Sequence, residues 1–115
     1  MRTEIWRDGG GRAWRVSVPE TRRERARGLR GRDELAPDEA LFLARCRSVH
    51  TFGMRFAIDV VLLDEGLTVL RVVRMHTGRL LLPRRGVRHI VEVAAGSGRR
   101  DRVQMSSARS ARLTR

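Results

Sequence analysis

Residues 58–73, IDVVLLDEGLTVLRVV, decide the fold of this chain. Two runs rich in β-branched residues flank the turn at residues 64–66, which is the pattern of a β-hairpin. The first run carries one acid, Asp59, among apolar neighbours. The stretch therefore predicts two paired strands, the first of which must satisfy a carboxylate close to the core.

Further short strands are predicted on both sides of this hairpin. The pattern indicates two strands around a Gly-rich turn in residues 4–18, a buried strand at residues 40–44, two strands in residues 78–94 broken at Pro83 and Gly86, and a last strand at residues 103–105. Many short strands separated by turns predict a mainly β fold, built as a sandwich or barrel.

One short helix is predicted near the N-terminus, after Pro19. Thr21 and Glu24 have the spacing of a capping box, in which each side chain satisfies a free backbone N–H of the other residue. Gly28 is placed to end the helix, because glycine adopts the backbone conformation that closes a helix at little cost.

The length of 115 residues predicts one β-rich domain, residues 1–105, followed by a basic tail at residues 106–115 that we expect to be disordered. No apolar run is long enough to cross a bilayer, and the N-terminus lacks the apolar core of a signal peptide. The single cysteine cannot form an internal disulfide, which fits a cytoplasmic location.

The chain is strongly basic, with a formal net charge of +12, and all 25 basic residues are arginine. Two arginine-rich flanks, residues 1–32 and 71–115, surround an acidic centre. An excess of this size favours contact with anionic ligands, acidic proteins or nucleic acid. The alternative is that the arginines only form a solvated surface and bind no partner. The candidate anion-binding residues are Arg22, Arg23, Arg84, Arg85 and Arg88.

Asp59 is the first candidate for a chemical role. A lone ionised carboxylate is costly to bury, so we expect it to pair with an arginine and to stabilise the fold. The functional alternative is a polar anchor or general base in a pocket.

Cys46 and His50 are the second candidate, because a thiolate and an imidazole are the minimum of a nucleophilic pair and both bind zinc. The sequence around them resembles half of a zinc motif without the second half. We therefore predict no metal and no cofactor, and treat both residues as weak catalytic candidates.

Four blocks, ERARGLRGR, ALFLA, HTFGMRFAIDVVLLDEG and IVEVAAG, together resemble the DUF-192 family, a domain of unknown function. The likeness runs from about residue 14 to residue 105. The methionine that usually follows Gly-Leu in the family is Arg30 here. The matching motif residues are Gly28, Leu29, Phe52, Met54, Ile58, Glu92 and Gly96.

The resemblance implies a small, jelly-roll-like, mainly β domain with a short helix. No activity, cofactor or substrate is established for the family, and many of its members are exported or membrane-associated. The resemblance also suggests that Asp59 pairs with Arg32 or Arg25, which would hold the helix exit against the central strand.

We therefore expect a small binding or interaction module whose arginine-rich faces suit an anionic ligand or partner, and not an enzyme. One alternative is a small hydrolase-like enzyme that uses Asp59 with His50 or Cys46 in a cleft. A second alternative is nonspecific nucleic-acid binding through the basic flanks.

Overall fold

The computed structural model describes residues 1–98 and residues 105–107, the latter as a strand. The expected tail lies outside these residues, apart from the two that end the last strand. The elements are β1 (Arg2–Asp8), β2 (Ala13–Val18), α1 (Arg22–Arg27), β3 (Glu39–Leu43), β4 (Val49–His50), β5 (Ile58–Leu63), β6 (Val69–Met75), β7 (Leu80–Leu81), β8 (His89–Ala94) and β9 (Met105–Ser107).

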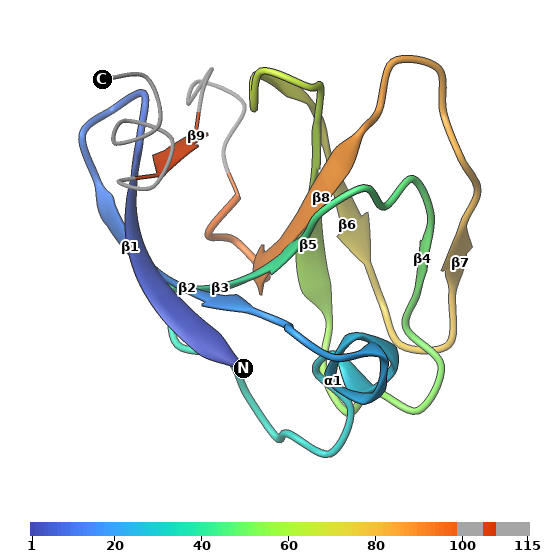
Figure 1. The fold of residues 1–115 in the computed structure, drawn as a ribbon. Coiled ribbons are helices and arrows are strands. Elements are labelled where there is room, and N and C mark those ends of the chain that lie inside the picture. The colour runs from blue at the N-terminus through green and yellow to red at the C-terminus, as the bar shows by residue number, and fades with distance from the viewer. Residues whose placement is uncertain (99–104, 108–115) are drawn as a thin grey trace.

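Seven strands form one open sheet in the order β6-β5-β8-β3-β2-β1-β9, and β4 and β7 form a separate two-stranded ribbon (Figure 1). The expectation of a mainly β single domain is confirmed. A closed barrel is ruled out, because β6 and β9 are the two edges of the large sheet. The jelly-roll-like arrangement stays a prediction.

The hairpin predicted at residues 58–73 is present as β5 and β6, with Ile58 opposite Met75 and a register shift between Leu62 and Leu63. All six residues of β5 are buried. The strand lies between β6 and β8, and its apolar residues alternate between two hydrophobic cores, so both of its faces are covered. This explains its almost continuous apolar sequence, which is typical of a strand buried on both sides.

The two faces of the sheet bury two separate cores. We call the first the helix face, because α1 and the β4–β7 ribbon lie on that side of the central strands (Figure 1). We call the other the tryptophan face, because Trp6 and Trp14 belong to its core. The helix-face core includes Leu29, Leu41, Leu43, Ile58, Val60, Leu62 and Ile90. The tryptophan-face core includes Val16, Val18, Val61, Leu63, Val91 and Val93.

The helix α1 joins two parallel strands, β2 and β3, which pair with Arg15 opposite Glu39. Thr21 caps its start by accepting a hydrogen bond from the Glu24 amide, and Gly28 ends it at a φ of 53°. A parallel pair needs such a crossover, which carries α1 onto one face of the sheet. No helix in the described part of the chain has the length and apolar character that crossing a membrane requires.

Candidate functional site

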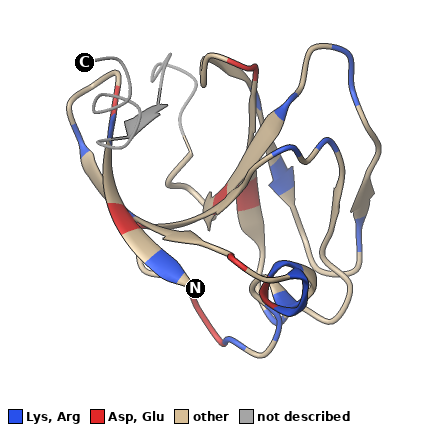
Figure 2. Ribbon diagram, viewed as in Figure 1, with Lys and Arg blue, Asp and Glu red and all other residues tan. Residues whose placement is uncertain are grey.

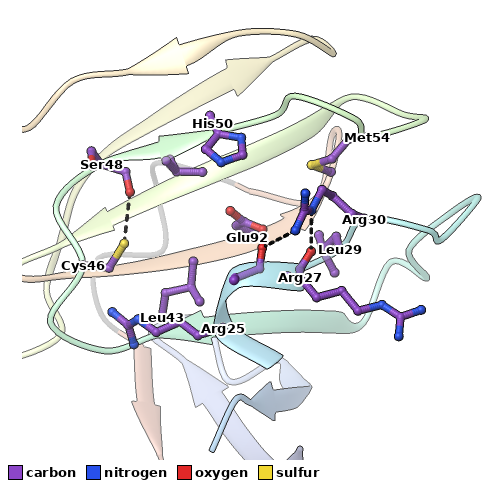
Figure 3. Close-up of a pocket in the computed structure, with 13 residues that line it drawn as sticks. Arg25, Arg27, Leu29, Arg30, Leu43, Cys46, Ser48, His50, Met54 and Glu92 are labelled. Atoms are coloured by element: carbon purple, nitrogen blue, oxygen red, sulfur yellow. Dashed lines mark hydrogen bonds between the residues drawn. The ribbon is translucent and has the colours of Figure 1, made fainter. Parts of the chain in front are cut away.

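The candidate site is a pocket of about 210 Å³ on the helix face, between the end of α1 and the segment that leads from β3 to residue 54. Its walls carry apolar side chains, an acid and several cations around one hollow (Figure 3). The lining residues are Arg25, Ala26, Arg27, Gly28, Leu29, Arg30, Leu43, Cys46, Ser48, Val49, His50, Met54 and Glu92.

One wall depends on Thr51, which is fully buried and holds its segment against the loop after β6. Its hydroxyl donates to the His76 carbonyl at 2.6 Å and accepts from the Arg79 amide at 2.9 Å. Met54 donates its amide to the Thr51 carbonyl. Because these bonds fix Thr51, they also fix the position of the neighbouring pocket residues His50 and Met54.

Glu92, on β8, is the central feature of the pocket. Its side chain lies among Cys46, His50 and Arg30 in Figure 3, and only 4% of the residue is exposed. Its carboxyl group makes no hydrogen bond or ion pair with any of the residues described. Among the described residues no fully enclosed side-chain oxygen or nitrogen lacks a partner, so the Glu92 oxygens are open to the pocket and are not sealed in the core. Glu92 therefore presents unused hydrogen-bonding capacity to the pocket.

Burial raises the pKa of Glu92 from an ordinary value of 4.5 to about 7, because desolvation penalises the charged carboxylate. The neighbouring strands meet Glu92 with apolar residues, Leu41 on β3 and Val60 on β5. Near neutral pH this carboxyl group is consequently divided between its acid and its carboxylate form, which suits it to accept or donate a proton.

Three arginines from the end of α1 line the pocket, and they are exposed. Arg30 donates to the carbonyls of Ala26 and Arg27, and so caps the C-terminal end of α1. Arg25 donates to the Ala44 carbonyl and thereby ties the helix to the end of β3. The lining is thus cationic around a buried acid, which favours an anion on electrostatic grounds.

Cys46 and His50 both line this pocket. The Cys46 thiol donates to the Ser48 carbonyl at 3.0 Å, and burial raises the pKa of the thiol. This is the opposite of the lowered pKa that a reactive thiolate needs. His50 stacks on the exposed ring of Phe52, with ring centroids 5.0 Å apart. Among the residues described, no group of three or more His, Cys, Asp or Glu side chains is placed to hold a metal ion.

Asp59 does not belong to the pocket. It is 3% exposed and accepts from Arg74 Nε at 2.5 Å and from the amides of Gly96 and Gly98 at 2.8 and 3.2 Å. An arginine partner was expected, but it is Arg74 and not Arg32 or Arg25. Arg74 is directly opposite Asp59 on β6, so the partner comes from the cross-strand register.

The proposed pairing of Asp59 with Arg32 or Arg25 is therefore wrong. Arg32 instead donates to both carboxylate oxygens of Glu39, at 3.1 and 3.3 Å. Arg25 is occupied with the Ala44 carbonyl. The helix exit is thus held by β3 and its flanks, and Asp59 instead holds the turn that follows β8.

Of the predicted anion-binding arginines, Arg22 and Arg23 lie exposed on the first turns of α1, and Arg84 and Arg85 lie in the exposed loop between β7 and β8. Arg88 lines a second, open hollow of about 430 Å³. Figure 2 shows arginine (blue) on α1 and in the loops before β4 and after β7.

The second hollow gathers arginines that the sequence did not bring together, because Arg45 and Arg47 join Arg88 there. Glu65 and His89 complete the lining. The Arg45 amide donates to His89 Nδ1 at 3.0 Å, which ties the two segments to each other.

The family-motif residues lie in four places. Gly28, Leu29, Met54 and Glu92 line the pocket. Ile58 is buried in the helix-face core. Gly96, at a φ of 88°, donates to Asp59 in the turn after β8. Phe52 is half exposed against His50.

Glu92 is the functional candidate that the sequence reasoning missed, since it entered only as a motif residue. The available signal was an acid inside the apolar run HIVEVA, which is the same signal that drew attention to Asp59. A sequence cannot show which of two such acids finds a partner, because the partners come from other strands.

A model of the DUF192 family, described as "Uncharacterized ACR", matches residues 4–108. A "putative transcription regulator" from Sinorhizobium meliloti has a similar structure, with a TM-score of 0.72 and 18% identity over 92% of each chain. A protein of unknown function from Novosphingobium aromaticivorans has a TM-score of 0.66 and 17% identity, over 82% of this chain and 73% of that chain. No curated protein matches the chain. At such identities the likeness to solved structures shows the fold alone.

Proposed function

The chain belongs to the DUF192 family, and we propose that this domain is a binding module for a small anionic organic ligand, which it takes into the pocket between α1 and β8. The single observation that carries the proposal is the carboxyl group of Glu92, which is buried, faces the pocket and has no partner among the described residues. The Glu92 oxygens remain accessible from the pocket, so a ligand there could hydrogen-bond to them directly.

The size and walls of the pocket support a small, partly apolar ligand. Its volume of about 210 Å³ is below the range of about 300–1,000 Å³ that holds drug-sized molecules. Leu29, Leu43 and Met54 offer apolar surface, and the arginines at the end of α1 offer positive charge. A short organic chain with an anionic group matches both features.

Binding is a better proposal than catalysis by Asp59. Asp59 is already engaged by Arg74 and two backbone amides. The pocket that contains Cys46 and His50 lies on the other face of the sheet. Asp59 cannot act together with either residue across the sheet, and the raised pKa of Cys46 argues against a thiolate nucleophile.

A titration with short carboxylates tests this proposal. Butanoate, hexanoate and benzoate are added to ¹⁵N-labelled protein, and amide shifts of residues 25–30, 46–54 and 92 are followed. We expect saturable shifts confined to these residues, and weaker binding in Arg30→Gln. The matched control is Arg71→Gln, which removes one exposed arginine away from the pocket. If shifts are absent at millimolar ligand, or equally reduced in both variants, the pocket is not an anion site.

A second candidate function, binding of nucleic acid or another polyanion, is favoured by Arg45, Arg47 and Arg88 around the open hollow. Their positive charge would be neutralised by phosphates with release of counterions. Retention on heparin that decreases in Arg47→Gln/Arg88→Gln, but not in Arg22→Gln/Arg23→Gln, supports this candidate. Equal loss in the two pairs indicates only the general charge of the chain. A cytoplasmic location stays a prediction.

A further inference from the structure

We propose that the anion bound in the pocket is a carboxylate and that its binding is coupled to the uptake of one proton by Glu92. Glu92 in its acid form then donates a hydrogen bond to the carboxylate of the ligand. This inference rests on the proposed function and specifies the chemistry of the same pocket. The proton comes from solvent on binding and returns to it on release, and no other bond is made or broken.

A protonated carboxyl group has one O–H donor, and the Glu92 carboxyl group makes no hydrogen bond with the described residues. The Cys46 thiol, another donor of the pocket, is already directed to the Ser48 carbonyl. A ligand oxygen in the hollow would be the acceptor that the acid lacks.

Two ionised carboxylates cannot share a small apolar site, and such pairs retain one proton between them. The raised pKa of Glu92, about 7, means that the proton is available near neutral pH at little cost. A bound carboxylate would raise that pKa further.

The charged and titratable groups facing Glu92 come from two segments. Arg25, Arg27 and Arg30 come from the end of α1, while Cys46 and His50 come from the segment after β3. The adjacent strands contribute Leu41 and Val60. The raised pKa of Glu92 has burial as its cause, with no arginine counteracting it. Arg25 and Arg30 already donate to backbone carbonyls, so they would attract the carboxylate of the ligand by their positive charge.

A ligand with a single ammonium group is the contrasting occupant. It would pair with ionised Glu92, and its binding would release a proton and strengthen as the pH rises. The three arginines in the lining disfavour such a cation. The sign of the pH dependence separates the two occupants.

The experiment is calorimetric titration of the protein with hexanoate between about pH 5.5 and pH 8.5, in two buffers of different ionisation enthalpy. We expect uptake of about one proton per hexanoate at the high end, and close to none at the low end. The dissociation constant should rise about tenfold per pH unit above the pKa of Glu92, as one linked proton requires. Hexan-1-ol and hexylammonium serve as neutral and cationic probes of equal length.

Two variants of similar volume complete the test. Glu92→Gln keeps a hydrogen-bond donor that does not titrate, so hexanoate should bind within about tenfold of the parent affinity, with no proton uptake and a flat pH profile. Glu92→Met lacks the donor and should bind about tenfold or more weakly. Melting temperatures establish that both variants fold.

The outcomes are distinguishable. Absence of binding by all three probes at every pH overturns the proposed function itself. Hexanoate binding without proton uptake, or with the same pH profile in Glu92→Gln, leaves the proposed function intact and refutes the role of Glu92. Preferential binding of hexylammonium, strengthening with pH, also refutes it and assigns a cationic ligand.

Discussion

Glu92 and Asp59 lie on adjacent strands of one sheet, and their side chains point to opposite faces. In the pairing of β5 with β8, Val60 is opposite Glu92 and Asp59 is opposite Val93. Asp59 therefore shares the tryptophan face with Val93, where it has three hydrogen-bond donors. Glu92 shares the helix face with Val60, where it has none among the described residues. Among the described residues, one acid is therefore held by three donors and the other lines the pocket without a partner.

The stability of the domain should fall as the pH rises towards 7, because of Glu92. Its pKa is about 7 in the folded chain against an ordinary 4.5, so the native state binds more protons than the unfolded state between these values. That difference lowers the free energy of unfolding by about 3 kcal/mol between about pH 4.5 and pH 7. Above about pH 8 Glu92 causes no further decrease, because it is ionised in both states.

Urea denaturation at a series of pH values measures this slope. Glu92→Gln, which cannot ionise, should flatten the profile, while Glu34→Gln on the exposed surface should leave it unchanged. An identical slope in Glu92→Gln and in the parent protein would mean that Glu92 is not the titrating group.

Asp59→Asn should destabilise the domain by about 3 kcal/mol, because it removes the charge that Arg74 and the Gly96 and Gly98 amides bind. Chemical denaturation provides the measurement, with Asp33→Asn as the control. Asp33 pairs with Arg55 on the exposed surface, and such pairs contribute about 0–1 kcal/mol.

Because Asp59 is outside the pocket, hexanoate should bind folded Asp59→Asn with the parent affinity. A variant of parent stability that no longer bound the ligand would show that Asp59 serves the site after all.

Gly98→Ala should destabilise the domain by about 1–3 kcal/mol, since the added methyl group has no room. A Cβ atom at this position would lie 3.0 Å from both Asp59 Cβ and Val72 Cγ1. Gly66→Ala is the matched control, since its Cβ would meet Asp64 Oδ1 at an ordinary 3.6 Å. Thermal unfolding compares the two, and an equal effect of both substitutions would contradict the close packing at Gly98.

Cys46 should react slowly with iodoacetamide at neutral pH. Burial raises the pKa of its thiol, so little thiolate is present, and the thiol donates to the Ser48 carbonyl. Mass spectrometry would follow alkylation of the folded chain and of the chain unfolded in urea, with Cys46→Ser as the blank. A folded rate equal to or above the unfolded rate would restore Cys46 as a candidate nucleophile.

Local patterns were sufficient where a structure depends on nearby residues. The capping box at Thr21 and Glu24 is present because both partners belong to one helical turn. The hairpin at residues 58–73 is present because its two strands are joined by a short turn. The ribbon strands β4 and β7 were not separately foreseen as a pair, since two-residue strands leave almost no periodic signal.

Relations between distant segments could not be obtained in this way. The parallel pairing of β2 with β3 and the position of β8 between β3 and β5 place α1 above Glu92. Register then selects Arg74 as the partner of Asp59, where sequence motifs had suggested Arg32 or Arg25.

The sequence alone determined that this protein has a mainly β fold, a capped helix, a basic net charge and two acids within apolar strands. Each of these features depends on composition or on neighbours along the chain. Only the tertiary structure decided which acid has partners in the described part of the chain and which lines the pocket, and which arginines surround a hollow. The reason is that burial and hydrogen-bond partners are set by strand register and by the face on which a side chain lies, and both depend on contacts between residues far apart in the chain.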